Sequence, residues 1–197
     1  MKPTARTITL AETLWPAQAE AGYRALRAGL LAVVGTLLIA LSAQFQVPMY
    51  PVPMTMQSFA VLVIGMAYGA RLGFATVLLY LAEGAVGLPV FAGMKGGAAH
   101  LLGPTGGYLV GFVLAAGLVG WLAERGWDRT MLRTFAAMMA GKVVIFLFGV
   151  GWLAGLIGLE KAVALGFVPF IYGIVLKVAL AMAVLPGAWA LLGRRAG

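Results

Sequence analysis

Three ionisable side chains lie inside long apolar stretches, where their charges need partners. Glu83, Lys142 and Lys177 each occur within a run of mostly hydrophobic residues. If these runs cross a membrane, a charge near the centre costs about 2.5–3.5 kcal/mol on insertion scales, so each side chain should face protein or water. An ion pair between Glu83 and one lysine would be purely structural, whereas an unpaired lysine in a cavity would suit a carboxylate ligand. The sequence leaves both alternatives open.

The remaining polar residues exclude several kinds of catalysis. The chain has no cysteine, a single histidine (His100), a single aspartate (Asp128) and two serines (Ser42 and Ser58). An aspartyl dyad needs two aspartates, and a Ser–His pair would need His100, which falls in a loop between apolar stretches. No G-x-x-x-x-G-K-[ST] phosphate-binding loop occurs. We therefore predict a non-enzymatic protein with no resident cofactor and no metal site.

The elements that position these residues are predicted to be membrane-spanning helices. Of the 197 residues, 62% are hydrophobic and 10% are charged, and the mean hydropathy of +1.00 is too high for a water-soluble domain. A span needs roughly 20 apolar residues, which leaves room for about six or seven spans. The apolar runs lack the alternation of barrel strands, so we predict an all-α membrane bundle of six transmembrane helices. The expected spans cover residues 24–45, 56–70, 72–88, 105–124, 133–157 and 167–192.

Basic residues indicate the orientation of this bundle. Ten of the 14 Lys and Arg residues lie on one side of the predicted map, and only Lys95 and Lys161 lie on the other. By the positive-inside rule, both termini are expected in the cytoplasm. Residues 1–22 are mixed and polar, which favours a cytoplasmic or interfacial arm, and residues 23–197 are expected to form a single transmembrane domain. The net charge of +8 is scattered over short loops, so nucleic acid is not an expected partner.

The two outward loops differ from simple polar turns. Residues 46–55 (QVPMYPVPMT) and 88–104 (LPVFAGMKGGAAHLLGP) are apolar and rich in proline or glycine. Their large side chains would need cover, so we expect these loops to fold back over the bundle as a lid. Interfacial connectors are the alternative, because aromatic residues also favour the headgroup region.

A stripe of small residues follows one face of the first expected span. Such a stripe permits close helix contact, which drives helix association in lipid. It would serve either packing within the bundle or docking to a separate membrane subunit. The stripe consists of Ala28, Ala32, Thr36 and Ala40.

Three segments carry a resemblance to a known family. PVPMTMQ at 51–57, GLPVFAGMKGG at 87–97 and GPTGGYLVGF at 103–112 resemble, in order and spacing, the signatures of the BioY family. The resemblance implies the biotin-binding subunit (S component) of an energy-coupling factor (ECF) importer in a prokaryotic cytoplasmic membrane. It further implies a transmembrane coupling subunit (T component) and ABC ATPase subunits as partners, with the stripe of the first helix contacting the coupling subunit.

The resemblance also implies which residues bind biotin. The vitamin needs an apolar slot for its fused rings, hydrogen bonds for its ureido group and a cation or donors for its carboxylate. Trp152 would alternatively be an interfacial anchor, because it lies near the outer end of its span. The expected binding residues are Thr55, Gln57, Tyr80, Glu83, Phe91, Lys95, Tyr108, Phe146, Trp152 and Lys177.

Two positions depart from the family pattern. Many members have P-F-x-x-G-D-x-x-K in the last helix, and the corresponding segment here is PFIYGIVLK, so Ile174 occupies the acidic position. Lys142 stands where a neutral polar residue is expected. A contact that the family makes through the acid must therefore come from elsewhere or be missing.

A self-sufficient secondary transporter of biotin or another small carboxylate is the alternative function. Such transporters generally have duplicated halves and coupling acids near the midplane. This chain has no clear repeat, and Glu83 is the only acidic residue away from the ends of its expected spans. A membrane scaffold would not explain the proline- and glycine-rich loops together with buried lysines. The pattern therefore favours a binding subunit.

Overall fold

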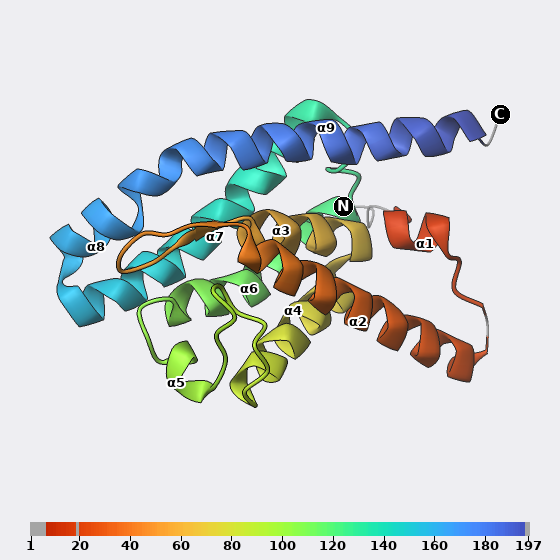
Figure 1. Cartoon of the computed structure of the whole chain (residues 1–197). Helices are drawn as coiled ribbons and strands as arrows, with labels where there is room; N and C mark the ends of the chain where they lie inside the picture. Colours follow the sequence, from red (N-terminus) through yellow and green to blue (C-terminus); the bar gives the residue numbers. More distant parts are fainter. Residues whose placement is uncertain (1–6, 19, 196–197) are drawn as a thin grey trace, which may run out of the picture.

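The fold is helical throughout, with one two-stranded hairpin. The computed structural model describes residues 7–18 and 20–195, and side chains as far as residue 192. The elements are α1 (Leu10–Leu14), α2 (Ala21–Gln44), β1 (Gln46–Val47), β2 (Met54–Thr55), α3 (Gln57–Tyr68), α4 (Ala70–Ala85), α5 (Ala98–Leu101), α6 (Gly106–Ala123), α7 (Met131–Ile157), α8 (Leu159–Gly166), η1 (Val168–Phe170) and α9 (Ile171–Arg195). Figure 1 shows α1 and the last turns of α9 at one end of the molecule, and α8 and the hairpin loop at the other. The predicted all-α class is confirmed.

The long helices lie where the sequence predicts them. Helices α2, α3, α4, α6, α7 and α9 each begin and end within a few residues of an expected span. Four stretches are long and apolar enough to cross a membrane: Ala21–Gln44, Gly106–Ala123, Met131–Ile157 and Leu159–Leu192. The protein is therefore a multi-pass membrane protein. Helices α3 and α4, with 12 and 16 residues, are shorter than the roughly 20 residues of a full span. The count of six spans and the cytoplasmic termini stay predictions.

Helix α6 lies at the centre of the bundle and packs against α3, α4 and α7. Most of its residues are buried, and many of them are Gly or Ala. A Cβ atom added to Gly65 of α3 would lie 2.7 Å from the carbonyl oxygen of Ala116, and one added to Gly111 would lie 3.0 Å from Cα of Ile145. Small residues thus let the backbones approach closely, as expected where lipid supplies no hydrophobic drive for association.

The turn between α3 and α4 depends on Gly69, whose φ is +83°. That angle is readily adopted by glycine alone. An added Cβ would also lie 2.7 Å from Oε1 of Glu124, the atom that accepts a hydrogen bond of 3.0 Å from the backbone N–H of Ala70. The carboxylate therefore caps the start of α4 and joins it to the end of α6.

The described part of the N-terminal arm packs on the bundle. A capping box between Thr9 and Glu12 begins α1. The buried guanidinium of Arg27 donates to the carbonyl of Trp15 at 2.6 Å and to that of Ala11 at 2.8 Å. The arm is thus held against α2, while residues 1–6 and 19 of the predicted arm lie outside the described residues.

The small-residue stripe of α2 faces helices of the same chain. Thr36 is 2% exposed, and Ala28, Ala32 and Ala40 are partly buried. A Cβ added to the neighbouring Gly35 would lie 2.6 Å from Cγ2 of Thr76 on α4. Packing within the bundle accounts for Thr36, and docking to a separate subunit stays a prediction.

The 46–55 loop closes on itself as a hairpin, and the 88–104 loop is hydrogen-bonded to the end of α2. Strands β1 and β2 pair antiparallel, with Gln46 opposite Thr55. The side chain of Gln44 donates to the carbonyl of Phe91 and accepts from the N–H of Met94, both at 3.1 Å. The loops therefore fold back on the bundle, and residues of both loops line one cavity.

Candidate functional site

A cavity lies beneath the 46–55 and 88–104 loops, between α3, α6, α7 and α9. Its empty volume is about 570 Å³, including the space at its mouth. The walls are mainly apolar and aromatic, and a few polar groups converge on them, which is the usual composition of a small-molecule site. The polar lining residues are Thr55, Gln57, Ser58, His100, Thr105, Tyr108, Lys142 and Lys177.

Three aromatic rings form one wall. Tyr108 of α6 lies edge-on to Phe146 of α7, with ring centroids 6.0 Å apart, and Phe146 lies 5.7 Å from Phe170 of η1. The Tyr108 hydroxyl donates to the carbonyl of Gly166 at 2.8 Å. Gly149 makes room for the Tyr108 ring, because an added Cβ would overlap it. The wall is therefore fixed by packing before any ligand binds.

A second wall depends on a chain of buried hydrogen bonds. The amide nitrogen of Gln57 donates to the Tyr80 hydroxyl, which donates in turn to the carbonyl of Val90, both at 2.7 Å. Tyr80 also lies edge-on to Phe91, at 5.6 Å between ring centroids. This chain holds the 88–97 loop against α4. This bond uses one of the two donors of the Gln57 amide nitrogen, so the carbonyl oxygen and the second N–H remain available to a ligand.

Two lysines bring amino groups into the cavity. Lys142 and Lys177 are 3% and 5% exposed, and both line it. Nζ of Lys142 donates to Oγ of Ser58 at 2.8 Å, whereas Lys177 has no hydrogen bond or ion pair with any described residue. Glu83 is half-buried on α4 and does not line the cavity. Within the described part of the chain, neither lysine forms the structural ion pair that the sequence left open.

His100 of α5 lies where the cavity meets an outer vestibule. Its ring stacks on Phe91 at 5.1 Å, and its Nε2 lies 3.2 Å from Oγ1 of Thr105. The vestibule has an empty volume of about 860 Å³, and Pro53, His100 and Thr105 line both spaces. Burial lowers the pKa of His100, and the charge of Lys95 lowers it further, which favours the uncharged ring.

The structure brings six of the ten sequence-predicted binding residues together. Thr55, Gln57, Phe91, Tyr108, Phe146 and Lys177 line the cavity, whereas Tyr80, Glu83, Lys95 and Trp152 do not. Lys95 lines the vestibule and is exposed. Trp152 donates its indole N–H to the carbonyl of Gly103 at 3.0 Å, which ties α7 to the loop before α6.

Several lining residues were not among the predicted binding residues. Lys142 carried a signal, because a charge inside a span needs an explanation. Phe170 lies in the PFIYGIVLK segment and Thr105 in GPTGG, so the motifs that carry the family resemblance also contained them. Ser58 carried no signal of its own. His100 was predicted only as a loop residue.

Comparison with known proteins identifies the family of this chain. The model of the BioY family matches residues 13–194. The chain belongs to the BioY family. A probable biotin transporter BioY of Pyrococcus horikoshii is 43% identical over 145 residues, which cover 74% of this chain and 85% of the relative. The biotin transporter BioY of Thermotoga maritima is 41% identical over 147 residues, covering 74% and 86%.

The fold of the BioY chain also matches a solved structure. The crystal structure of the S-component for biotin from an ECF-type ABC transporter superposes with a TM-score of 0.72 and covers 85% of this chain and 93% of that one. The sequences are 23% identical, so this likeness concerns the fold alone. The fold of the BioY chain is therefore that of an S component.

Proposed function

We propose that this protein is the membrane-embedded biotin-binding subunit of an ECF-type ABC importer. It captures biotin at the outer face, and separate coupling (T component) and ATPase subunits power uptake. Biotin is the transported ligand, and the protein needs no resident cofactor. Two relatives that are more than 40% identical carry the name biotin transporter, which supports the choice of ligand.

One observation carries the proposal from the structure: two buried ammonium groups share an apolar cavity in which no described carboxylate pairs with them. A buried charge is costly unless it is paired, so the cavity suits an anionic ligand. The wall of Tyr108, Phe146 and Phe170 suits the fused rings of biotin. The Gln57 side chain suits its ureido group.

The proposed setting is a prokaryotic cytoplasmic membrane crossed six times, with both termini in the cytoplasm. The positive-inside pattern supports this orientation. The arrangement in Figure 1 also supports it, because α1 and the end of α9 lie opposite the hairpin loop and α5. The cavity would then open outward through the vestibule.

Reconstitution into liposomes tests the transport part of the proposal. The purified protein alone, and the protein together with coupling and ATPase subunits, would be given external labelled biotin with ATP enclosed. ATP-dependent accumulation that requires the partner subunits supports the proposal. Accumulation by the protein alone, driven by an ion gradient, would instead establish a secondary transporter.

A further inference from the structure

The amino group of Lys142 is not explained by packing alone. The residue belongs to α7 and shares a helix face with Ile145 and Phe146, which also line the cavity. Its side chain is almost completely buried, so its ammonium group is screened from bulk water. The group lies at the cavity and not at the lipid surface.

The hydrogen-bonding capacity of this ammonium group is only partly used. A lysine ammonium group has three N–H donors and no acceptor. One donor bonds to Oγ of Ser58 at 2.8 Å, and no further acceptor for Lys142 occurs among the described residues. Donors that are buried without acceptors cost free energy. A ligand oxygen would accept from the N–H donors of Lys142 that have no partner in the protein.

The competing explanation is that the Lys142–Ser58 hydrogen bond only holds α7 against α3. Such a bond needs one donor to Ser58, and the remaining N–H donors of Lys142 would be buried without acceptors. Lys177 already places one cation at the cavity. A second cation there favours a ligand with oxygen acceptors at two separate positions, such as a carboxylate and a ring carbonyl.

We propose that Lys142 is a second ligand-binding cation of this cavity, whose Nζ donates to an oxygen of the bound vitamin while Ser58 positions it. The proposal rests on the proposed function, because it takes biotin as the ligand. Biotin has oxygen acceptors in its carboxylate and in its ureido carbonyl. The shared chemistry is a hydrogen bond from an ammonium group to an anionic or carbonyl oxygen.

Isothermal titration of the full chain in detergent tests the proposal. Wild type, Lys142→Met and a control, Lys161→Met on the exposed surface of α8, would be titrated with biotin, its methyl ester and its 2-thio analogue. We expect Lys142→Met to bind biotin at least about tenfold more weakly, the loss typical of a hydrogen bond to a charged group. The control should bind like wild type.

The analogues identify the oxygen. If Lys142 contacts the carboxylate, the variant loses less affinity for the methyl ester; if it contacts the ureido oxygen, the variant loses less for the 2-thio analogue. Either result supports the proposal. A folded variant that binds all three ligands as wild type does overturns it. Failure of wild type to bind biotin would overturn the proposed function itself, which separates the two failures.

Ser58 provides a second test if Lys142→Met does not fold. Ser58→Ala leaves the ammonium group in place and removes its positioning partner, so we expect about a threefold loss of biotin affinity and a changed ranking of the analogues. Ser58→Thr keeps the hydroxyl and should restore the wild-type ranking. Unchanged affinity and ranking in folded Ser58→Ala would contradict the positioning role.

Discussion

Nζ of Lys142 on α7 lies 2.8 Å from Oγ of Ser58 in the first turn of α3. Both residues line the cavity, so this hydrogen bond joins two of its walls at the point where a ligand would lie. With Lys177 unpaired among the described residues, the cavity has cationic donors from α7 and α9. An anion with an apolar body would suit both the lysine donors and the apolar walls of the cavity.

Lys177 is expected to matter far more for binding than Lys95. Lys177→Met removes an unpaired, buried cation from the cavity, so biotin affinity should fall by about tenfold or more. Lys95→Met removes an exposed charge at the vestibule and should change affinity by less than about threefold, because solvent screens exposed charges. Titration calorimetry of both variants checks this. A larger loss for Lys95→Met would move the carboxylate contact to the vestibule.

Two glycines of α7 offer a matched test of the cavity wall. Gly149→Ala places a methyl group where the Tyr108 ring lies, whereas a Cβ at Gly151 meets nothing within 4 Å. Gly149→Ala should destabilise the fold by about 1–3 kcal/mol through overpacking and weaken ligand binding by displacing Tyr108. Gly151→Ala should be neutral or stabilising by up to about 1 kcal/mol. Thermal unfolding in detergent measures both effects. Equal effects of the two changes would contradict the close packing of Tyr108 against Gly149.

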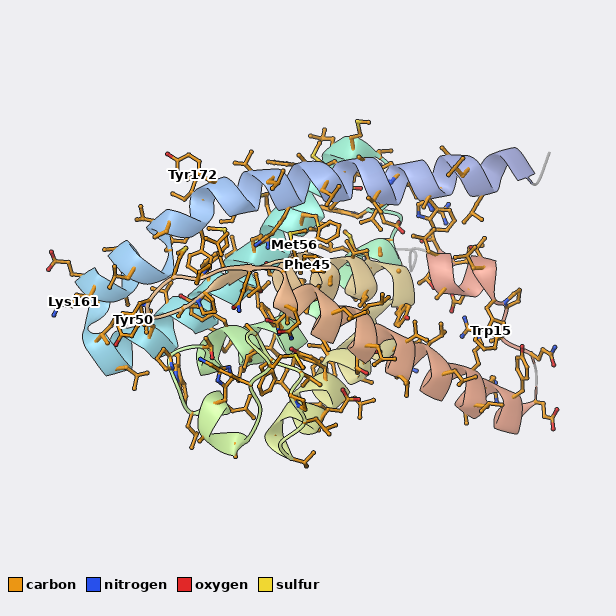
Figure 2. All side chains as sticks on the ribbon, viewed as in Figure 1. Trp15, Phe45, Tyr50, Met56, Lys161 and Tyr172 are labelled. Carbon is orange, nitrogen blue, oxygen red and sulfur yellow. The ribbon has the colours of Figure 1, made fainter. Side chains whose placement is uncertain are left out.

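Tyr80 does not line the cavity, but its hydrogen bonds are expected to support the residues that do. Tyr80→Phe leaves the Gln57 amide and the Val90 carbonyl without their partner, at a cost of about 1–3 kcal/mol in the free energy of unfolding. It should also loosen the 88–97 loop and speed dissociation of the ligand. Tyr172→Phe is the control, because Tyr172 points away from the bundle on α9 (Figure 2) and is 85% exposed. If both variants melt and release biotin as wild type does, the hydrogen-bond chain has no role in holding the loop.

Asp128, in the loop between α6 and α7, should make stability depend on pH. Its Oδ2 accepts the indole N–H of Trp189 at 2.7 Å, and its buried Oδ1 has no hydrogen-bond partner among the described residues. Burial raises the pKa of Asp128, although the Trp189 hydrogen bond and nearby Arg129 act in the opposite direction. The folded protein therefore keeps this proton to higher pH than the unfolded chain, and the free energy of unfolding falls as pH rises through that window.

Asp128→Asn tests this pH dependence, because the amide oxygen still accepts from Trp189 without a charge. The variant should melt at a higher temperature than wild type at pH 7, and the difference should shrink as pH falls toward about 4, near the ordinary pKa of an aspartate. Melting curves followed by tryptophan fluorescence across this range provide the measurement. Glu160→Gln, at an exposed position on α8, is the control. A lower melting temperature for Asp128→Asn at pH 7 would contradict the prediction.

The sequence predicted the helices well because their signals are local. Long apolar runs placed α2, α6 and α7 within a few residues of their observed bounds. Helix α8 was not predicted, because its eight residues are too few for a span and its Glu160 and Lys161 resemble a polar loop. The ends of short elements depend on tertiary contacts that no local pattern contains.

Binding residues could be predicted where they belong to a recognisable motif. They were harder to predict where the direction of the side chain decides whether a residue lines the cavity. Phe91 and Tyr108 were expected from their motifs, and both line the cavity. Tyr80 and Trp152 were equally reasonable candidates, but their polar atoms bond to the carbonyls of Val90 and Gly103. Which way a side chain points on a helix is set by the neighbouring helices, and a single sequence does not give their arrangement.

The most direct test of the account is isothermal titration of the purified, ligand-stripped protein with biotin in detergent. We expect saturable one-to-one binding that weakens in Lys177→Met, and weaker binding of the biotin methyl ester to wild type. No heat of binding, from protein shown to be folded by its melting curve, would contradict the central claim that this cavity binds biotin.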